Sequence, residues 1–99
     1  MKEFTKEEVA KVANRPGNYY FYDKYGALLY VGWSAILKHR LQSYYQKDDF
    51  SAHPTKKVLR SKIAYFTVHY RPLARAQKVE MKVKAKAPYK FMKAGLRRN

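Results

Sequence analysis

Cysteine is absent from this chain of 99 residues, and glycine is scarce, with four scattered copies. Without cysteine the chain has no disulfide, no thiolate nucleophile and no cysteine-ligated zinc. Four scattered glycines are too few for a glycine-rich nucleotide cradle. No apolar run approaches the roughly 18 residues of a membrane-spanning helix, and no apolar signal-peptide region follows the N-terminus. We therefore expect an intracellular, cytoplasmic protein with no membrane partner.

Acidic residues are also scarce, and their distribution is uneven. The chain has 22 Lys and Arg residues against 7 Asp and Glu, for a formal net charge of +15. Residues 1–49 contain 8 basic and 6 acidic residues, whereas residues 50–99 contain 14 basic residues and one carboxylate, Glu80. A basic excess of this size favours a polyanionic partner. Nucleic acid is the first candidate and an anionic membrane surface the second. Interleaved tyrosines, which can stack on bases, favour nucleic acid over a basic face that is merely solvated.

The length and the hydrophobic fraction of 46% predict one small domain with a single core. We expect a single domain over 1–99, with its core at roughly 15–88 and a basic tail over 90–99. Thr5 and Ser34 are the predicted N-caps of the first two helices. The residue pattern predicts an α+β fold, a small three-stranded antiparallel sheet flanked by helices. The predicted helices are 5–14, 35–45, 55–60 and 73–86, and the predicted strands are 18–22, 27–31 and 63–70, with a polar loop over 46–54.

Two short strands containing tyrosine and glycine carry the strongest sequence signal. Gly17-Asn18-Tyr19 lies in the first and Tyr30-Val31-Gly32 in the second. Asp and Gly in the polar turn between them predict an antiparallel hairpin. Arg40 and Tyr44 follow in a helix-like stretch, and Glu80 comes much later among lysines. This order resembles the GIY-YIG nuclease domain family and is similar to the N-terminal nuclease domain of the excinuclease type. The resemblance implies the α+β fold and a metal-dependent endonuclease that hydrolyses DNA phosphodiester bonds, with a place in DNA repair.

Glu80 is the candidate metal ligand. On a helix over 73–86 it shares its face with Ala76 and Val83, where an unpaired charge is costly. The residues alone leave open a metal ion or an ion pair with Lys84 one turn later. The resemblance implies the metal, Mg²⁺ or Mn²⁺, because the family places a metal-binding glutamate on the helix after the third strand. Mg²⁺ takes oxygen ligands and keeps several waters, so one carboxylate, water and a substrate phosphate can complete its shell.

The resemblance implies four further catalytic residues. Arg40 would bind the scissile phosphate, because a guanidinium pairs with phosphate through two parallel hydrogen bonds. Tyr19 or Tyr30 would position or deprotonate the attacking water, and Tyr44 would help to position the nucleophile or the phosphate. A free tyrosine has a pKa of about 10, so a phenolate base needs help from cations. The residues alone leave open a solvated arginine and tyrosines that only fill the core.

Aromatic and basic side chains form the candidate nucleic-acid interface. Trp33 could stack on a base, and basic side chains supply affinity for phosphates without sequence readout. The implied substrate is DNA, with branched and damaged DNA both left open. Because so small a domain has little room for specificity, we expect a partner protein or a homodimer to supply it. The predicted interface residues are Trp33, Lys38, His39, Arg75, Lys78, Lys82, Lys84 and Lys86.

Two positions depart from the pattern of the family. Many members carry a lysine directly after the second motif, where this chain has Trp33. Many also carry an asparagine shortly after the proline that corresponds to Pro88, where this chain continues Tyr89-Lys90-Phe91. An alternative function is therefore a catalytically impaired nucleic-acid-binding module of the same fold. A third is a basic adaptor for an acidic protein or RNA, in which the tyrosines belong only to the core.

Overall fold

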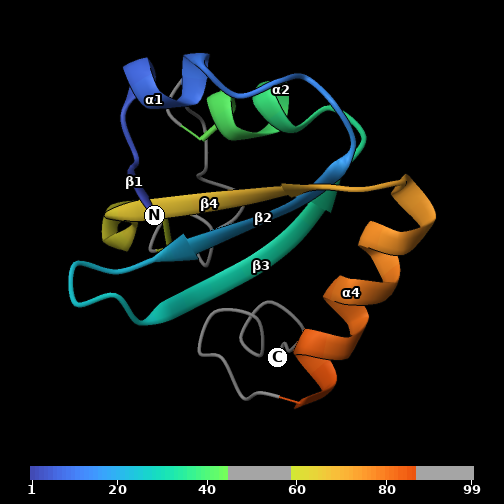
Figure 1. Cartoon of the computed structure of the whole chain (residues 1–99). Helices are drawn as coiled ribbons and strands as arrows, with labels where there is room; N and C mark the ends of the chain where they lie inside the picture. Colours follow the sequence, from blue (N-terminus) through green and yellow to red (C-terminus); the bar gives the residue numbers. More distant parts are fainter. Residues whose placement is uncertain (45–58, 87–99) are drawn as a thin grey trace.

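A computed structural model describes residues 1–44 and 59–86, and Figure 1 shows their arrangement. One antiparallel sheet contains, in this order, β1 (Lys2–Glu3), β4 (Tyr65–Tyr70), β2 (Gly17–Tyr22) and β3 (Leu28–Ser34). Residues 59–62 are helical. Among the described helices, none is both long and apolar enough to cross a membrane. The other helices are α1 (Lys6–Ala10), α2 (Leu37–Gln42) and α4 (Leu73–Lys86).

The α+β class is confirmed, and the structure adds a fourth strand to the three that were predicted. Lys2 pairs with Phe66 and Glu3 with Tyr65, so β1 lies along the outer edge of β4. A strand of two residues is too short to show an alternating pattern, and its pairing depends on β4. The predicted loop 46–54, most of the predicted helix 55–60 and the tail 90–99 lie outside the described residues.

Helix ends agree with prediction where a local signal defines them. Thr5 caps α1, and its Oγ1 accepts a hydrogen bond from the Glu8 backbone N–H at 3.1 Å. The helix ends at Ala10, earlier than predicted, whereas α4 begins at the predicted Leu73 and is helical up to Lys86, the last described residue. The prediction that Ser34 caps α2 is wrong. Ser34 ends β3, its Oγ accepts the Ile36 N–H at 3.0 Å, and Ile36 occupies the cap position of a shorter helix.

The turn between β2 and β3 fixes how the two motif strands pair. The Asp23 carboxylate accepts the backbone N–H groups of Tyr25 and Ala27, both at 2.9 Å. Gly26 has a φ of 86°, a conformation that favours glycine. The resulting antiparallel register places Tyr19 opposite Gly32. The predicted hairpin is therefore confirmed.

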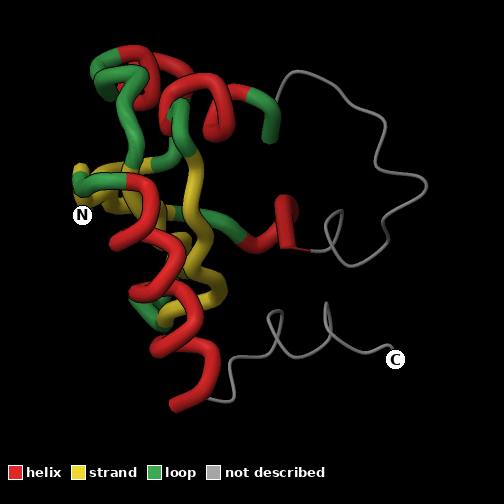
Figure 2. The backbone as a smooth tube through the Cα atoms, turned by 90° about the vertical axis from the view of Figure 1, so that its right-hand side faces the viewer, coloured by secondary structure: helices red, strands yellow, loops and turns green. Residues whose placement is uncertain are grey.

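The two faces of the sheet are covered by different helices. Tyr19 and Phe21 point into a core with α1 and α2, which lie on one side of the sheet in Figure 1. Asn18, next to Tyr19 on β2, reaches α4 on the other side. Figure 2 shows α4 as the long helix beside the strands. The core residues on the α1 and α2 side include Val9, Val12, Leu29, Leu37, Leu41, Tyr44, Leu59 and Phe66.

Candidate active site

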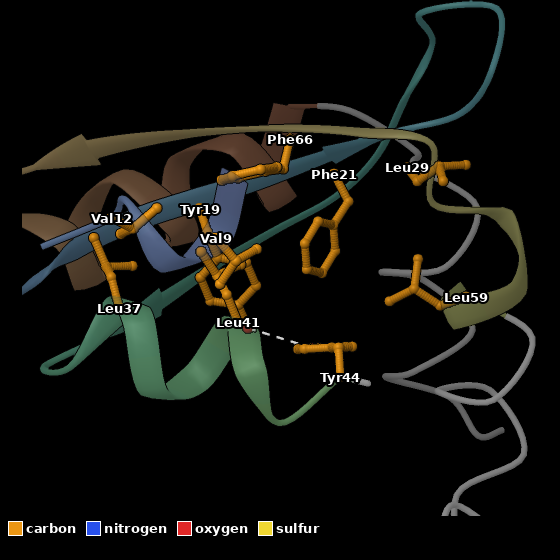
Figure 3. Packing of buried hydrophobic residues seen from close by; sticks show 10 residues of the cluster. All are labelled: Val9, Val12, Tyr19, Phe21, Leu29, Leu37, Leu41, Tyr44, Leu59 and Phe66. Atoms are coloured by element: carbon orange, nitrogen blue, oxygen red, sulfur yellow. Dashed lines mark hydrogen bonds between the residues drawn. The ribbon is translucent and has the colours of Figure 1, made fainter. Parts of the chain in front are cut away.

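Three tyrosines from separate elements meet in a group that we name the tyrosine cluster: Tyr19, Tyr30 and Tyr44. Tyr19 is 2% exposed and Tyr44 is 3% exposed, whereas Tyr30 is half-buried. The Tyr19 and Tyr44 hydroxyls are 3.5 Å apart, marked by the dashed line in Figure 3. The ring centroids of Tyr19 and Tyr30 are 6.1 Å apart. The fold thus gathers three phenol groups that lie up to 25 positions apart in sequence.

Gly32 makes room for the phenol of Tyr19. A methyl group at this position would overlap the ring and the hydroxyl of Tyr19, so the phenol lies directly against the Gly32 backbone. The backbone of β3 is the floor of the cluster at this point, and a side chain there would push the phenol away. The glycine of the second motif is therefore explained by packing against the tyrosine of the first.

Burial dominates the acidity of all three phenols. It raises the pKa of Tyr19 and of Tyr30 well above 10, and the negative charge of Glu80 adds to the shift at Tyr30. Burial also raises the pKa of Tyr44 to about 12. The positive charge of Arg40 opposes the shift at each phenol. All three phenols are therefore protonated at neutral pH, and a phenolate would need further positive charge beside it.

Arg40 places a positive charge at the solvent side of the tyrosine cluster. Its side chain is exposed on α2, yet its charge acts on Tyr19, Tyr30 and Tyr44. No carboxylate in the described part of the chain forms an ion pair with it. An exposed guanidinium beside buried hydroxyl groups can bind an anion such as a phosphate.

Glu80 is a carboxylate whose charge acts on the tyrosine cluster. Its side chain is 14% exposed, and its Oε2 lies 2.9 Å from the Lys84 Nζ, so the ion pair considered from the sequence is present. Its charge adds to the shift that burial and Tyr19 produce in the pKa of Tyr30. Residues 1–44 and 59–86 contain no group of three or more His, Cys, Asp or Glu that could hold a metal. A hard divalent cation would fit Glu80 together with water and phosphate oxygens, in competition with Lys84.

The predicted interface residues fall on three elements. Arg75, Lys78 and Lys82 are exposed at helical spacing on α4, and we name them the outer stripe. Lys84 points toward Glu80 instead, and the side chain of Lys86 lies outside the described residues. The remaining members are Trp33, half-buried on β3, and Lys38 and His39 on α2, of which His39 is exposed.

Sequence reasoning missed the role of two polar residues beside the site. Asn18 is fully buried, although the sequence places it only as the middle residue of the first motif. Its Oδ1 accepts a hydrogen bond from the guanidinium of Arg71, the residue directly after β4. An asparagine within a run of aromatic strand residues is itself a signal, because a buried amide needs partners for all its polar atoms.

The fold and the arrangement of these residues are those of a small domain of the GIY-YIG class. A family described as the UvrC-like GIY-YIG domain matches residues 15–85, and the chain belongs to this family. The chain is 36% identical over 64 residues to UvrABC system protein C of Syntrophomonas wolfei, and 37% identical over 67 residues to that of Streptococcus thermophilus. These matches cover 65% and 67% of the chain but only 10% and 11% of the relatives.

Solved structures show the same fold. The GIY-YIG N-terminal endonuclease domain of UvrC from Thermotoga maritima, bound to its catalytic divalent cation magnesium, superimposes with a TM-score of 0.74. The two sequences are 22% identical, and the match covers 92% of this chain and 98% of that one. A point variant of that domain, with an asparagine replaced by alanine and the divalent cation bound, superimposes with a TM-score of 0.71. These likenesses confirm the predicted fold.

Proposed function

We propose that this protein is a divalent-metal-dependent endonuclease that hydrolyses phosphodiester bonds of DNA. The observation that carries the proposal is the convergence of the tyrosine cluster, Arg40 and Glu80 from the sheet and two helices. Membership of the UvrC-like GIY-YIG family supports it. The magnesium-bound domain of Thermotoga maritima supports Mg²⁺ or Mn²⁺ as the cofactor.

Each residue has a role in this proposal. Arg40 binds the scissile phosphate and stabilises the charge that develops on it. Glu80 would hold the metal ion, which when bound polarises the phosphate and stabilises the leaving oxygen. Tyr19 or Tyr30, as a phenolate, accepts a proton from water while the water oxygen bonds to phosphorus and the bond to the leaving oxygen breaks. The Tyr44 hydroxyl lies 3.5 Å from the Tyr19 hydroxyl and orients the Tyr19 phenol.

DNA is the proposed substrate because of the charge of the chain and the kind of relatives it has. The outer stripe supplies contacts to the phosphate backbone without sequence readout. One metal site in each chain fits nicking of one strand better than a double-strand break. A partner protein or a second copy of the chain would supply the preference for branched or damaged DNA.

Nicking of supercoiled plasmid by the purified protein, with Mg²⁺, Mn²⁺ or EDTA, tests the proposal. Glu80→Gln keeps the size of the side chain and removes its charge, and we expect at least a hundredfold loss of nicking with DNA binding nearly intact. Glu8→Gln is the matched control, because Glu8 is also a glutamate with lysine partners on a helix. Full nicking by Glu80→Gln would refute the assignment of the metal to this residue.

A catalytically impaired nucleic-acid-binding module is the second candidate function. The observation that favours it is the ion pair of Glu80 with Lys84, which occupies one carboxylate oxygen. This candidate predicts salt-sensitive DNA binding by the wild type with no metal-dependent nicking of plasmid, branched or damaged DNA. The same nicking assay, repeated on those substrates, separates the two candidates.

A further inference from the structure

Asn18 joins the two halves of the candidate site through a buried amide. Its side chain is 0% exposed, and its Nδ2 donates hydrogen bonds to the Gly32 carbonyl at 3.0 Å and to the Ala76 carbonyl at 2.9 Å. Gly32 is the floor beneath Tyr19 on β3, and Ala76 lies near the start of α4. One amide group therefore spans from the tyrosine cluster to the helix that carries Glu80.

Arg71 fixes the orientation of this amide. Its guanidinium donates a hydrogen bond to the Asn18 Oδ1, and its backbone N–H donates to the Pro16 carbonyl at 3.1 Å. Because a guanidinium can only donate and a carbonyl can only accept, the amide has one orientation that satisfies every partner. No carboxylate among the described residues forms an ion pair with Arg71. The Asn18 side chain is thus held from three directions.

The carbonyl of Ala76 connects this amide to Glu80. In an α-helix the N–H of each residue donates to the carbonyl four residues earlier. Because α4 is helical over Leu73–Lys86, this rule makes the Ala76 carbonyl the acceptor of the Glu80 N–H. Ala76 is 0% exposed, so its carbonyl receives the helix bond and the Asn18 bond inside the protein. A movement of the Asn18 amide would change the turn from which the Glu80 carboxylate extends.

We propose that Asn18, held by Arg71, is a positioning residue that sets the distance of Glu80 from the tyrosine cluster. The effect of that distance on metal affinity and turnover rests on the proposed function, whereas the anchoring of α4 by Asn18 does not. Residues that orient a metal ligand from behind typically change metal affinity 10- to 100-fold when they are replaced. A misplacement of about 1 Å typically costs a hundredfold in rate.

Two variants test the inference. They are chosen so that their change in charge and their change in position would shift Mn²⁺ affinity in opposite directions. Asn18→Asp keeps the size of the side chain but loses the amide donors, and Arg71→Met removes the partner of Oδ1. Both changes make the protein more negative and would, through charge alone, tighten the binding of Mn²⁺. Positioning instead predicts that Mn²⁺ binding, measured by electron paramagnetic resonance at one ion per chain, weakens about tenfold. Turnover at saturating DNA should fall about a hundredfold.

Val9→Ala is the stability control, because Val9 is buried in α1 on the opposite face of the sheet. Hydrogen exchange of the Glu80 amide gives a readout that needs no activity, and we expect about tenfold faster exchange in Asn18→Asp but not in Val9→Ala. If the wild type neither binds Mn²⁺ nor nicks DNA, the proposed function fails, and this exchange still decides whether Asn18 anchors α4.

If Asn18→Asp does not fold, Arg71→Met is compared with Val9→Ala instead, by the same exchange and Mn²⁺ measurements. Exchange and Mn²⁺ affinity no different from those of Val9→Ala would overturn the inference. Tighter Mn²⁺ binding in both Asn18→Asp and Arg71→Met would also overturn it, since charge and not position would then govern the site.

Discussion

The two sides of α4 carry charge in different ways. On the inner side, Ala76 is fully buried and its carbonyl accepts a hydrogen bond from Asn18. The Glu80 side chain is 14% exposed and forms an ion pair with Lys84. On the outer side, the residues of the outer stripe are exposed to solvent. A partly buried charge interacts strongly and depends on geometry, whereas exposed charges are screened over a distance of about 8 Å at physiological salt. One helix thus separates a positioned carboxylate from an adaptable cationic surface.

The largest difference should appear between an arginine beside the tyrosine cluster, Arg40 on α2, and an arginine of the outer stripe, Arg75 on α4. Arg40→Ala removes the guanidinium beside the tyrosine cluster, and we expect turnover at saturating DNA to fall about 10²- to 10³-fold, as for other preorganised donors to a transition state. Arg75→Ala, in the outer stripe, should change turnover little. Single-turnover nicking measures both. Equal losses in the two variants would remove the distinction between a catalytic and a binding arginine.

The pH dependence of nicking tests the enclosed phenols. Burial holds the pKa of Tyr19 and of Tyr30 above 10, so the phenolate fraction rises about tenfold per pH unit below that value. A phenolate base therefore predicts a rate that rises with unit slope from about pH 6 to 9 without a plateau. Tyr19→Phe and Tyr30→Phe identify the base, since the slope should vanish in one of them. A flat profile in the wild type would assign the tyrosines to positioning alone.

Two glycines give a matched pair of substitutions inside and outside the site. Gly32→Ala should destabilise the protein by about 1 to 3 kcal/mol and lower nicking about tenfold, because its methyl group would displace the Tyr19 phenol. Gly26→Ala, at a φ of 86° in the exposed turn, should cost about 1 to 2 kcal/mol and leave nicking unchanged. Thermal unfolding and plasmid nicking measure the two effects. Unchanged nicking in Gly32→Ala would show that the phenol position does not matter.

Lys84→Met should strengthen metal binding. Its ammonium lies 2.9 Å from the Glu80 Oε2 and competes with a cation for that oxygen. We expect Mn²⁺ affinity to rise about three- to tenfold, measured by electron paramagnetic resonance. Lys78→Met, from the outer stripe, removes the same charge without touching Glu80 and should have little effect. Equal affinities in the two variants would mean that the ion pair does not compete with the metal.

The smallest effects should come from the outer stripe. Lys78→Ala should weaken DNA binding about two- to threefold and reduce the salt dependence of binding by about one phosphate contact. Turnover at saturating DNA should not change, because an exposed lysine binds substrate and transition state equally. Titrations of labelled duplex DNA at several salt concentrations provide the measurement. A loss of turnover in this variant would place the stripe in the catalytic site.

Prediction from sequence worked where the information is local. Thr5 caps α1 as predicted, and α4 begins at the predicted Leu73, because caps and helical periodicity act over a few residues. Prediction failed where a distant partner decides. β1 exists because β4 offers an edge, and Ser34 continues β3 because it pairs with Gly17 across the sheet. The motifs identified the residues of the candidate site. The distances between these residues could not be predicted, because they depend on how the strands and helices pack.

The sequence by itself determined the basic character of the chain, the α+β class, the hairpin of the two motifs and the order of Tyr19, Tyr30, Arg40, Tyr44 and Glu80. Each of these follows from composition or from short-range patterns. Only the tertiary structure decided that the Tyr19 phenol lies against Gly32, that burial raises the pKa of all three phenols, and that Asn18 links β3 to α4. These features depend on burial and on contacts between residues far apart in the chain, which exist only once the sheet and α4 have packed together.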